Sequence, residues 1–479
     1  MNLIYRIFSF VLAVFYPIIG FRISFMPSEC DYDFNISKAA LSASEINVNG
    51  QKVSYTLSGG AFENGALKLN GEAVITFSQQ DCYWFNYYGI AYSADEYLKG
   101  EIVYGKNKEV LCEEFFVEPA IGGEFYSFID GMLDNVKANK LYSVKFTPLS
   151  AESATLKISG IATFNREIPN REVYIQNDHV KIGIDLLWGG ALSCYEDLDS
   201  NVEAVKVDGK IKVDSNASER YGKRAVNKNV NLINRNDTGR LVQQSYYGTS
   251  GTETDGYEPG VFMGNVWNYN PVQGGNQFNE SSKIVDLRVS ENELYVKCRP
   301  LDWALPKENI TPSYMESTYT IEGKNVHAEC RFVDYSGYTP YYTSQEIPAF
   351  YCVEPLNRFV YYGGNEPWTG GELSVEPDLI FWPDAGYPKF NGTENWSAFI
   401  GEFDDSFGIG VYVADETEFL AGVYSRGNTE EKDPSKADPT SYIAIIKFRT
   451  FQSFEPYSYD FYLTSGNAEE IRNNFSVIR

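Results

Sequence analysis

One stretch of the chain, residues 173–198, reads VYIQNDHVKIGIDLLWGGALSCYEDL. A strand-like apolar run leads into Gly189-Gly190, and a second strand-like run follows the two glycines. Glycine accepts the backbone angles of a tight turn, and two strands joined by such a turn form a β-hairpin. Strand-like runs interrupted by such turn residues are typical of a β-rich region.

Strand-like runs of this kind continue along the chain. The runs at 67–78 (LKLNGEAVITFS) and 154–164 (ATLKISGIATF) partly alternate apolar and polar residues and then become continuously apolar. The breaks between such runs are rich in Gly, Asn, Asp and Pro, as in all-β sandwiches. Amphipathic helices are scarce, with a short candidate at 468–475 (AEEIRNNF). The sequence therefore predicts an all-β fold.

A polar segment at 165–172, NREIPNRE, separates two strand-rich regions. The chain has 479 residues, which is too long for one ordinary core and fits two domains. We therefore expect a first domain at 30–167 and a second at 170–479. The second is long enough for one large sandwich rather than a standard seven-strand one.

The N-terminal residues 1–29 have the character of a targeting segment. Arg6 is the first charge, and a largely apolar run from Ile7 to Phe21 follows it. This run is short for a membrane span, which needs ~20 apolar residues, and fits a signal peptide or an uncleaved anchor. We therefore expect a secreted or cell-surface protein with no integral membrane domain other than that anchor.

The net charge and the amino-acid composition limit the classes of partner that this protein is expected to bind. Lys and Arg number 40 and Asp and Glu 65, which gives a net charge of −25. Such a surface repels phosphate backbones, so we expect no nucleic-acid partner. Tyr, Phe and Trp make up 15 % of the chain; their rings suit the apolar faces of sugars, and they equally fill β-sheets. The seven cysteines contain no C-x-x-C pair, so a zinc site is not indicated. We expect no metal and no cofactor, and we expect Cys298 and Cys330 to be buried thiols.

Several segments resemble known carbohydrate-active proteins. Residues 113–133 (EEFFVEPAIGGEFYSFIDGML) resemble the strand, loop and returning strand of jelly-roll modules. The stretch at 173–198 and the segment 317–337 (STYTIEGKNVHAECRFVDYSG) resemble the opening hairpin and central strand pair of the galactose-mutarotase-like supersandwich. The resemblance implies an N-terminal jelly-roll-like β-sandwich followed by a large galactose-mutarotase-like supersandwich. It also implies a concave sheet face that binds sugar. The same fold occurs in epimerases, glycoside hydrolases and polysaccharide lyases, so the fold alone does not determine the reaction.

The segment 234–248 (NRNDTGRLVQQSYYG) is dense in hydrogen-bonding side chains, among them Asp237, Arg240, Gln243 and Tyr246. Residues two apart on a strand share a face, so the two adjacent glutamines would point to opposite faces. Glutamine on both faces is unusual in a dry core and indicates that one face lines a wet cleft. Arg240 could clamp a uronate carboxylate or stabilise an oxyanion; alternatively it pairs with Asp237 at a loop.

The segment 267–276 (WNYNPVQGGN) has the composition of a polar loop with aromatic side chains. Trp267 can stack on a sugar ring, while Asn268 and Gln273 can bind sugar hydroxyls. Loops of this kind often line functional sites. Few apolar residues lie next to Trp267 in the sequence. We therefore expect its ring to line a sugar-binding site rather than to pack in the core.

Two glutamates are candidates for acid–base catalysis. Glu346 precedes an apolar strand, and Glu394 stands two residues before Trp396, a further candidate for sugar stacking. An apolar neighbourhood raises a carboxyl pKa towards the range in which the group exchanges protons at neutral pH. Two carboxylates that flank a sugar could hydrolyse a glycosidic bond. The alternative for each glutamate is a solvated or salt-bridged side chain.

Epimerases of the resembling fold use a histidine acid with a glutamate base. Neither His179 nor His327 has the flanks of the epimerase motif, so an aldose epimerase is disfavoured. The segments 234–248, 267–276, 344–351 and 392–399 also resemble a pattern in uncharacterised bacterial exported proteins. This resemblance implies no catalytic residue. We expect an exported carbohydrate-active protein that cleaves a polysaccharide or oligosaccharide, as a glycoside hydrolase or polysaccharide lyase. The alternative is a non-catalytic carbohydrate-binding or cell-surface protein.

Overall fold

The chain is almost entirely built of strands. The computed structural model describes residues 41–106, 108–132, 136–248, 256–377, 379–380, 388–427 and 431–479. The leader expected at 1–29 and Cys30 lie outside these residues. The described α-helices are short, namely α2 (Ala217–Arg220) and α3 (Ala468–Ser476), and none is long and apolar enough to cross a membrane. The predicted all-β class is confirmed.

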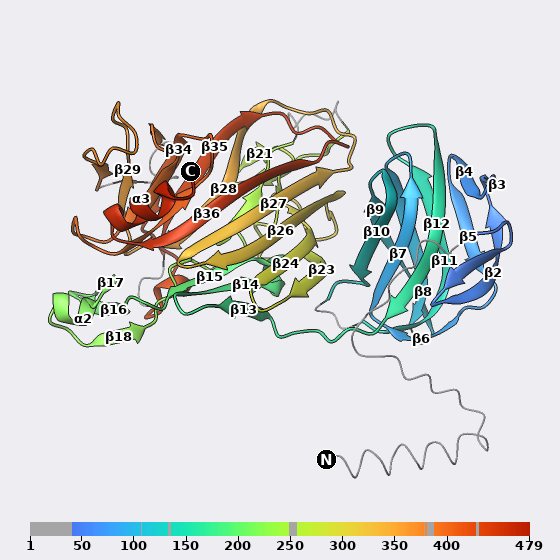
Figure 1. Ribbon diagram of the computed structural model, residues 1–479, viewed down its shortest axis with the longest axis horizontal. Coiled ribbons are helices and arrows are strands. Elements are labelled where there is room, and N and C mark those ends of the chain that lie inside the picture. The colour runs from blue at the N-terminus through green and yellow to red at the C-terminus, as the bar shows by residue number, and fades with distance from the viewer. Residues whose placement is uncertain are drawn as a thin grey trace, which may run out of the picture.

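The first module is a β-sandwich formed by one 12-stranded sheet, drawn in blue and teal in Figure 1. The strand order is β10-β7-β12-β1-β2-β5-β11-β8-β9, with β3, β4 and β6 beside this path. Alternating residues of these strands, such as Leu67, Ile75 and Leu156, form its core. The strands are β1 (Glu45–Val48), β2 (Gln51–Ser58), β3 (Ala61–Glu63), β4 (Ala66–Asn70), β5 (Ala73–Phe77), β6 (Asp81–Phe85), β7 (Tyr87–Ala94), β8 (Leu98–Lys106), β9 (Glu109–Val117), β10 (Ala120–Phe128), β11 (Ala138–Pro148) and β12 (Ser153–Phe164).

The larger part of the chain contains two sheets, and the first of them has ten strands. Its order is β13-β14-β15-β19-β28-β35-β34-β31, with β22 and β25 attached at β19. The bounds are β13 (Glu172–Gln176), β14 (Val180–Asp185), β15 (Ala191–Asp197), β19 (Val242–Ser245), β22 (Pro271–Val272), β25 (Leu301–Asp302), β28 (Thr343–Val353), β31 (Lys389–Asn391), β34 (Glu418–Tyr424) and β35 (Thr440–Arg449).

The second large sheet has nine strands in the order β23-β24-β26-β27-β36-β33-β32-β29-β30. Its strands are β23 (Lys283–Val289), β24 (Glu293–Arg299), β26 (Ser313–Glu322), β27 (Asn325–Asp334), β29 (Arg358–Tyr361), β30 (Ser374–Glu376), β32 (Trp396–Ile400), β33 (Gly408–Tyr412) and β36 (Tyr457–Gly466). Small additions are the sheet β17-β16-β18, the hairpin β20–β21 and two 3₁₀ turns, with bounds β16 (Val202–Val207), β17 (Lys210–Ser215), β18 (Ala225–Lys228), β20 (Gly260–Phe262), β21 (Asn265–Trp267), η2 (Leu186–Trp188) and η4 (Pro434–Lys436).

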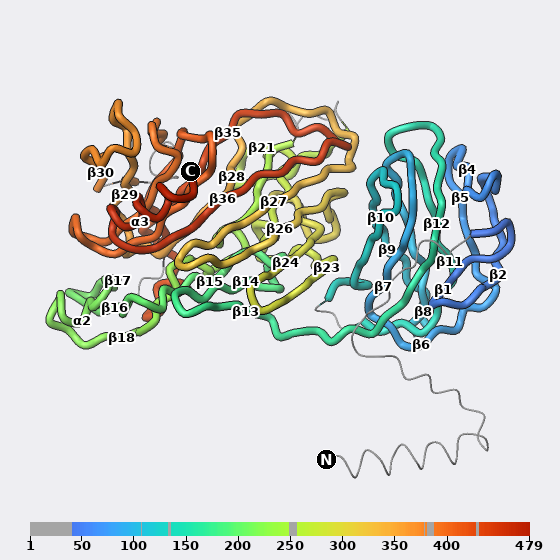
Figure 2. Tube along the Cα trace, in the orientation of Figure 1, coloured from blue at the N-terminus to red at the C-terminus, as the bar shows by residue number. Residues whose placement is uncertain are grey.

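The two large sheets face each other across one apolar core, to which both contribute alternate residues. Ile347 and Phe350 of β28 belong to it, as do Ala328 and Phe332 of β27. Figure 2 traces the chain from β12 into β13 and on through these sheets. The expected large two-sheet sandwich is confirmed. Cys298 and the other thiol predicted to be buried both lie in this core, and the six described cysteines are unpaired.

The stretch at 173–198 forms the three-stranded meander β13–β14–β15. Asp185 caps the turn η2 by accepting a hydrogen bond from the Leu187 backbone N–H at 2.9 Å. Gly189 has a φ of +59°, and a Cβ there would lie 1.8 Å from the Gln273 carbonyl oxygen. Only glycine fits at this position, so the predicted glycine turn is confirmed.

Helix α3 covers part of the outer face of the nine-stranded sheet, as Figure 1 shows near the C-terminus. Asn467 and Glu470 form a reciprocal capping box at its start. Ile471 and Phe475 then pack against Trp396 and Tyr412 of the sheet. The short helix predicted at 468–475 is therefore confirmed.

The first module contacts the nine-stranded sheet through buried polar and aromatic groups. Asp286 of β23 is buried, and it accepts a hydrogen bond from the Tyr87 hydroxyl at 2.7 Å and pairs with Arg166 at 3.2 Å. Nearby, the Phe116 ring stacks on Tyr335 with centroids 4.9 Å apart. These contacts join the two bodies that lie side by side in Figure 1.

Replacing Asp286 should show how much this junction contributes to stability. Asp286→Ala leaves the buried Tyr87 hydroxyl without its acceptor, which should lower the free energy of unfolding by about 1–3 kcal/mol. Urea unfolding measures the loss. The control is Asp404→Ala, whose side chain is 94 % exposed and which should leave the midpoint unchanged. Equal stability of the two variants would contradict the junction described above.

Candidate functional site

The outer face of the ten-stranded sheet carries a separate cluster of side chains. On β28 the residues that alternate with its core positions are Glu346, Ala349 and Tyr351. Strand β35 pairs with β28 and adds Tyr442 directly opposite Tyr351. We call the surface formed by Glu346, Tyr351, Tyr442, Tyr424 and Arg240 the tyrosine face.

Glu346 lies at one end of the tyrosine face and is half-buried. Its burial raises its pKa to about 7, and the Tyr442 hydroxyl, which donates a hydrogen bond to it, opposes that rise only in part. No charged group contributes to the shift among the described residues. A carboxyl group in this state can give or take a proton at neutral pH.

Arg240 lies at the other end of the tyrosine face. Its guanidinium carbon is 5.4 Å from the ring centroid of Tyr351 and 5.5 Å from that of Tyr424. The rings of Tyr351 and Tyr442 are in turn 4.4 Å apart with an interplanar angle of 31°. The row of contacts runs from Arg240 through two tyrosines to Glu346, so the structure brings these two predicted residues onto one face.

A tight turn at residues 237–240 positions the Arg240 side chain on the tyrosine face. Asp237 accepts a hydrogen bond from the Gly239 N–H at 2.9 Å, and its carbonyl accepts one from the Arg240 N–H at 3.2 Å. Gln243 donates from its amide to the Arg240 carbonyl at 2.6 Å. Leu241 follows with a φ of +79°, an unusual angle for a residue with a side chain. The turn is thus held at several points.

The glutamines of this region serve the core rather than a wet cleft. Gln244 points between the sheets and donates to the Glu316 carbonyl at 2.7 Å, while Gln273 accepts from the Gln244 N–H at 3.2 Å. Gln243 is 3 % exposed and Tyr246 is fully buried. The expectation that Gln243, Tyr246 and Gln273 bind substrate is therefore corrected, because their polar atoms are buried and bonded to the protein.

Glu394 occupies a different position from that expected. It is fully buried next to α3, where Arg472 donates to it at 3.0 Å and the Trp396 indole N–H at 2.6 Å. Trp396 is likewise fully buried. Both lie at the nine-stranded sheet, so the structure does not bring Glu394 together with Glu346. The proposed pair of flanking carboxylates and the stacking role of Trp396 are not supported, because a buried ion pair accounts for both residues.

Trp267 lies in the hairpin β20–β21 and is half-buried, as is its neighbour Asn268. The indole N–H donates to the Asn270 side chain at 3.1 Å. Its ring lies 6.2 Å from that of Tyr247, a residue close enough to Tyr442 for their charges to interact. Trp267 is therefore near the tyrosine face, and its contact with sugar remains a prediction, as does that of Asn268.

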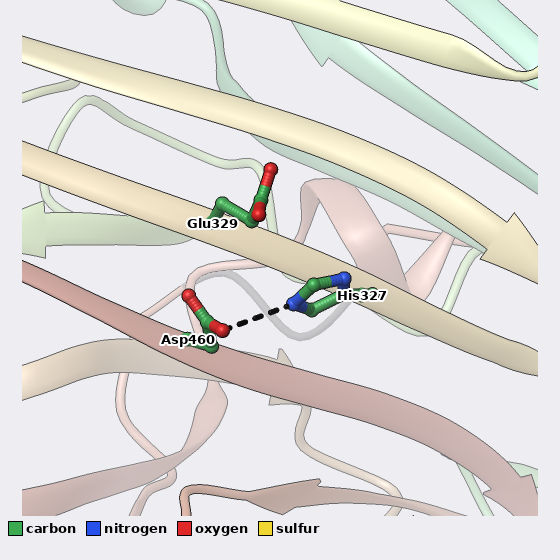
Figure 3. Close-up of side chains that lie close together, drawn as sticks. All are labelled: His327, Glu329 and Asp460. Carbon is green, nitrogen blue, oxygen red and sulfur yellow. Dashed lines mark ion pairs between the residues drawn. The ribbon is translucent and has the colours of Figure 1, made fainter.

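Two other polar groupings are less suited to a ligand. Figure 3 shows His327 and Glu329 on β27 beside Asp460 on β36, with 3.4 Å between the imidazole and Asp460. Their ligand atoms lie within 4.8 Å of one another, but both carboxylates are exposed on a solvated sheet face.

A cleft of about 670 Å³ opens beside the loop 401–407. Its two basic side chains already form ion pairs, Lys212 with Glu402 and Arg358 with Asp404.

The sequence alone did not reveal the tyrosines. Tyr351, Tyr424 and Tyr442 come from three strands far apart in the chain, and a tyrosine in an apolar strand is most simply explained by packing. The one local signal is that Tyr351 lies five positions after Glu346, within the segment 344–351.

No family model and no curated protein matches the sequence. Solved structures do match. A putative aldose 1-epimerase from Escherichia coli K12 has a TM-score of 0.32 at 10 % identity, covering 61 % of this chain and 98 % of its own. An α-galactosidase from Geobacillus stearothermophilus scores 0.31 at 11 % identity, covering 62 % and 40 %. An α-mannosidase from Enterococcus faecalis V583 scores 0.31 at 10 % identity, covering 92 % and 43 %. All three matches have TM-scores below 0.5, so the galactose-mutarotase-like supersandwich remains an expectation from the sequence.

The raised pKa of Glu346 predicts a pH dependence of stability. The folded protein keeps this proton up to about pH 7, whereas the unfolded chain releases it near the ordinary pKa of 4.5. Between these values the folded state binds more protons, so stability falls as pH rises from 4.5 to 7 and then levels off. The loss attributable to Glu346 is up to ~3 kcal/mol.

Urea unfolding between pH 4.5 and 8 measures this effect. Glu346→Gln should lack the part of the slope that Glu346 causes, so it should gain stability over the wild type as pH rises. Glu329→Gln, an exposed control on the other large sheet, should keep the wild-type slope. Parallel curves for wild type and Glu346→Gln would show that Glu346 is an ordinary carboxylate.

Glu394 should prove structural. Arg472→Ala leaves a buried carboxylate without its cation, which should lower the free energy of unfolding by about 3–5 kcal/mol, measured in urea. The double variant Glu394→Gln with Arg472→Ala should recover part of the loss, because no charge then remains buried. A stable Arg472→Ala variant that had lost an activity on glycans would return Glu394 to the functional site.

Proposed function

We propose that the tyrosine face binds carbohydrate and that Glu346 exchanges a proton with the substrate while a glycosidic bond is cleaved. The observation that carries the proposal is Glu346 itself, a half-buried carboxyl group with a pKa of about 7 and a tyrosine hydroxyl as its partner. Strongly shifted carboxyl groups concentrate at functional sites. A general acid or base in this state contributes roughly 10²–10⁴-fold to a reaction rate.

The rings beside Glu346 fit a sugar. Tyr351 and Tyr424 are half-buried, so each combines an apolar ring with access to solvent. Sugar rings have apolar faces and polar rims, and an aromatic row with hydroxyl tips matches both. Arg240 adds hydrogen-bond donors at the far end of the row. Both a hydrolase and a lyase can use an acid or base in such a place.

Export belongs to the same proposal. The apolar run after Arg6 would direct the chain out of the cytoplasm, where polysaccharides are met. Fractionation of the producing cells and N-terminal sequencing of the protein test this step. Recovery in the cytoplasm with the N-terminus intact would overturn it.

A second function, glycan binding without turnover, is favoured by a specific observation. Glycoside hydrolysis generally uses two carboxylates about 5–10 Å apart. Tyr442 is the one hydrogen-bond partner that affects the pKa of Glu346 among the described residues, and no second carboxylate influences it. A binding protein has no need of such a partner.

A screen of polysaccharides with Glu346→Gln separates these functions. If Glu346 is the acid or base, the wild type cleaves at least one glycan, and the variant loses about 100-fold or more in rate while still binding it. Reducing ends without ultraviolet absorbance identify a hydrolase, and absorbance of an unsaturated uronate identifies a lyase.

The matched control is Glu329→Gln, which should keep full activity because Glu329 is exposed on the opposite sheet. Binding by the wild type without any turnover would favour the second function. Neither binding nor turnover of any glycan would refute the proposal.

A further inference from the structure

Two neighbouring aromatic side chains project into solvent from the first module. Tyr83 and Trp84 belong to β6, at the lower end of that module in Figure 1, and they are 45 % and 43 % exposed. Among the residues that the structure describes, neither ring contacts another aromatic ring, and neither the hydroxyl nor the indole N–H has a hydrogen-bond partner. Both rings therefore present apolar surface to solvent together with a polar tip.

An irregularity in the pairing of β6 explains why both rings face outward. Residues 81–85 of β6 pair with residues 138–140 of β11, so three residues between the outer pairs lie opposite a single one. In a regular strand two adjacent side chains point to opposite faces, and one of these rings would enter the core. A bulge breaks that alternation, and bulges commonly re-aim side chains beside functional sites. The strand thus exposes two large rings at one place.

The residues beside the rings are polar. Gln79 is exposed and Gln80 half-buried, and both directly precede β6. The side chain of Asp81 is 84 % exposed and pairs with Lys140 at 2.7 Å. Amides and carboxylates bond to hydroxyl groups, whereas the C–H face of a sugar covers an aromatic ring. Both kinds of contact are available here.

Size and charge favour a glycan over other classes of ligand. Two rings exposed to this extent present about 200 Å² of surface, whereas a stable protein interface takes ~800 Å² from each partner. The net charge of −25 opposes nucleic acid and anionic lipid. It also opposes an anionic glycan, because the nearby Lys140 is already neutralised by Asp81.

We propose that Tyr83 and Trp84 bind a neutral polysaccharide by stacking on its sugar rings, while the amides of the preceding glutamines bond to its hydroxyl groups. This site lies on the first module and is separate from the tyrosine face. It transfers no proton and does not depend on the reaction proposed for Glu346. A polymer bound here would keep the second domain close to its substrate.

Fluorine NMR of the full chain labelled with 5-fluorotryptophan tests the proposal at the site itself. The Trp84 resonance is identified by its absence from Trp84→Phe. The probes are cellohexaose, xylohexaose, mannohexaose and galactohexaose as neutral glycans, polygalacturonate as an anionic one, and phosphatidylcholine vesicles as a lipid surface. At least one neutral probe should shift the Trp84 resonance.

Variants titrated through the same resonance show which residues bind. Tyr83→Ala should weaken the neutral probe about two- to tenfold, the range expected for the loss of one stacked ring. Its urea midpoint should stay unchanged, because the side chain is exposed. Ile121→Ala removes a fully exposed apolar side chain from β10 of the same module and is the control, which should bind as the wild type does. Glu346→Gln should also leave this titration unchanged.

Failure of this inference differs from failure of the proposed function. A Trp84 resonance that no neutral glycan moves would overturn the inference, and a shift with the vesicles alone would assign the rings to a lipid surface instead. A titration that Tyr83→Ala leaves unchanged would remove Tyr83 from the site, and one that Glu346→Gln abolishes would show that the site is not separate. A protein without turnover whose Trp84 resonance still responds would refute the proposed cleavage and retain this site.

Discussion

The packing of two large sheets against one apolar core determines which side chains of these sheets face outward. Side chains alternate along a strand, so each residue committed to the core turns its neighbours outward. On β28, Phe350 lies inside, so Ala349 and Tyr351 face out. An irregularity in register between Glu346 and Ala349 lets Ile347 also lie inside, with Glu346 on the same face as Tyr351. The same rule turns Tyr442 of β35 outward, because its neighbour Ile443 is a core residue. The tyrosine face is thus a geometric consequence of the core, and its chemistry depends on which residues occupy the outward positions.

The features that were predictable from the sequence are those with local causes. The all-β class, the glycine turn after η2 and the helix at 468–475 follow from periodicity, turn chemistry and a capping pattern. The tyrosine face has no such local cause. Tyr351, Tyr424 and Tyr442 meet because β28, β35 and β34 are neighbours in the sheet, and that register is set by long-range packing. Sequence reasoning therefore found the two ends of the row, Glu346 and Arg240, without the rings between them.

The incorrect expectations share one physical reason, which is that a sequence shows hydrogen-bonding capacity but not how it is used. Gln243 and Gln273 were expected to meet a ligand, yet they bond to backbone groups that the fold would otherwise leave unsatisfied. A buried backbone N–H or C=O requires a partner, and a glutamine side chain reaches further than a turn can. A segment rich in amide side chains is therefore as typical of a loop held by side-chain hydrogen bonds as it is of a solvated cleft.

The contrast between Glu346 and Glu394 shows what distinguishes a reactive carboxyl group from a structural one. Both stand beside apolar sequence, and both are removed from water to a large extent. Glu394 meets Arg472, which lies 78 positions further along the chain, together with an indole and a backbone N–H, so its charge is fully compensated. Glu346 meets one neutral hydroxyl, and desolvation therefore dominates its proton affinity. The fold supplies a cation to one glutamate and none to the other. Glu346 can therefore exchange a proton at neutral pH, whereas Glu394 stays in its ion pair.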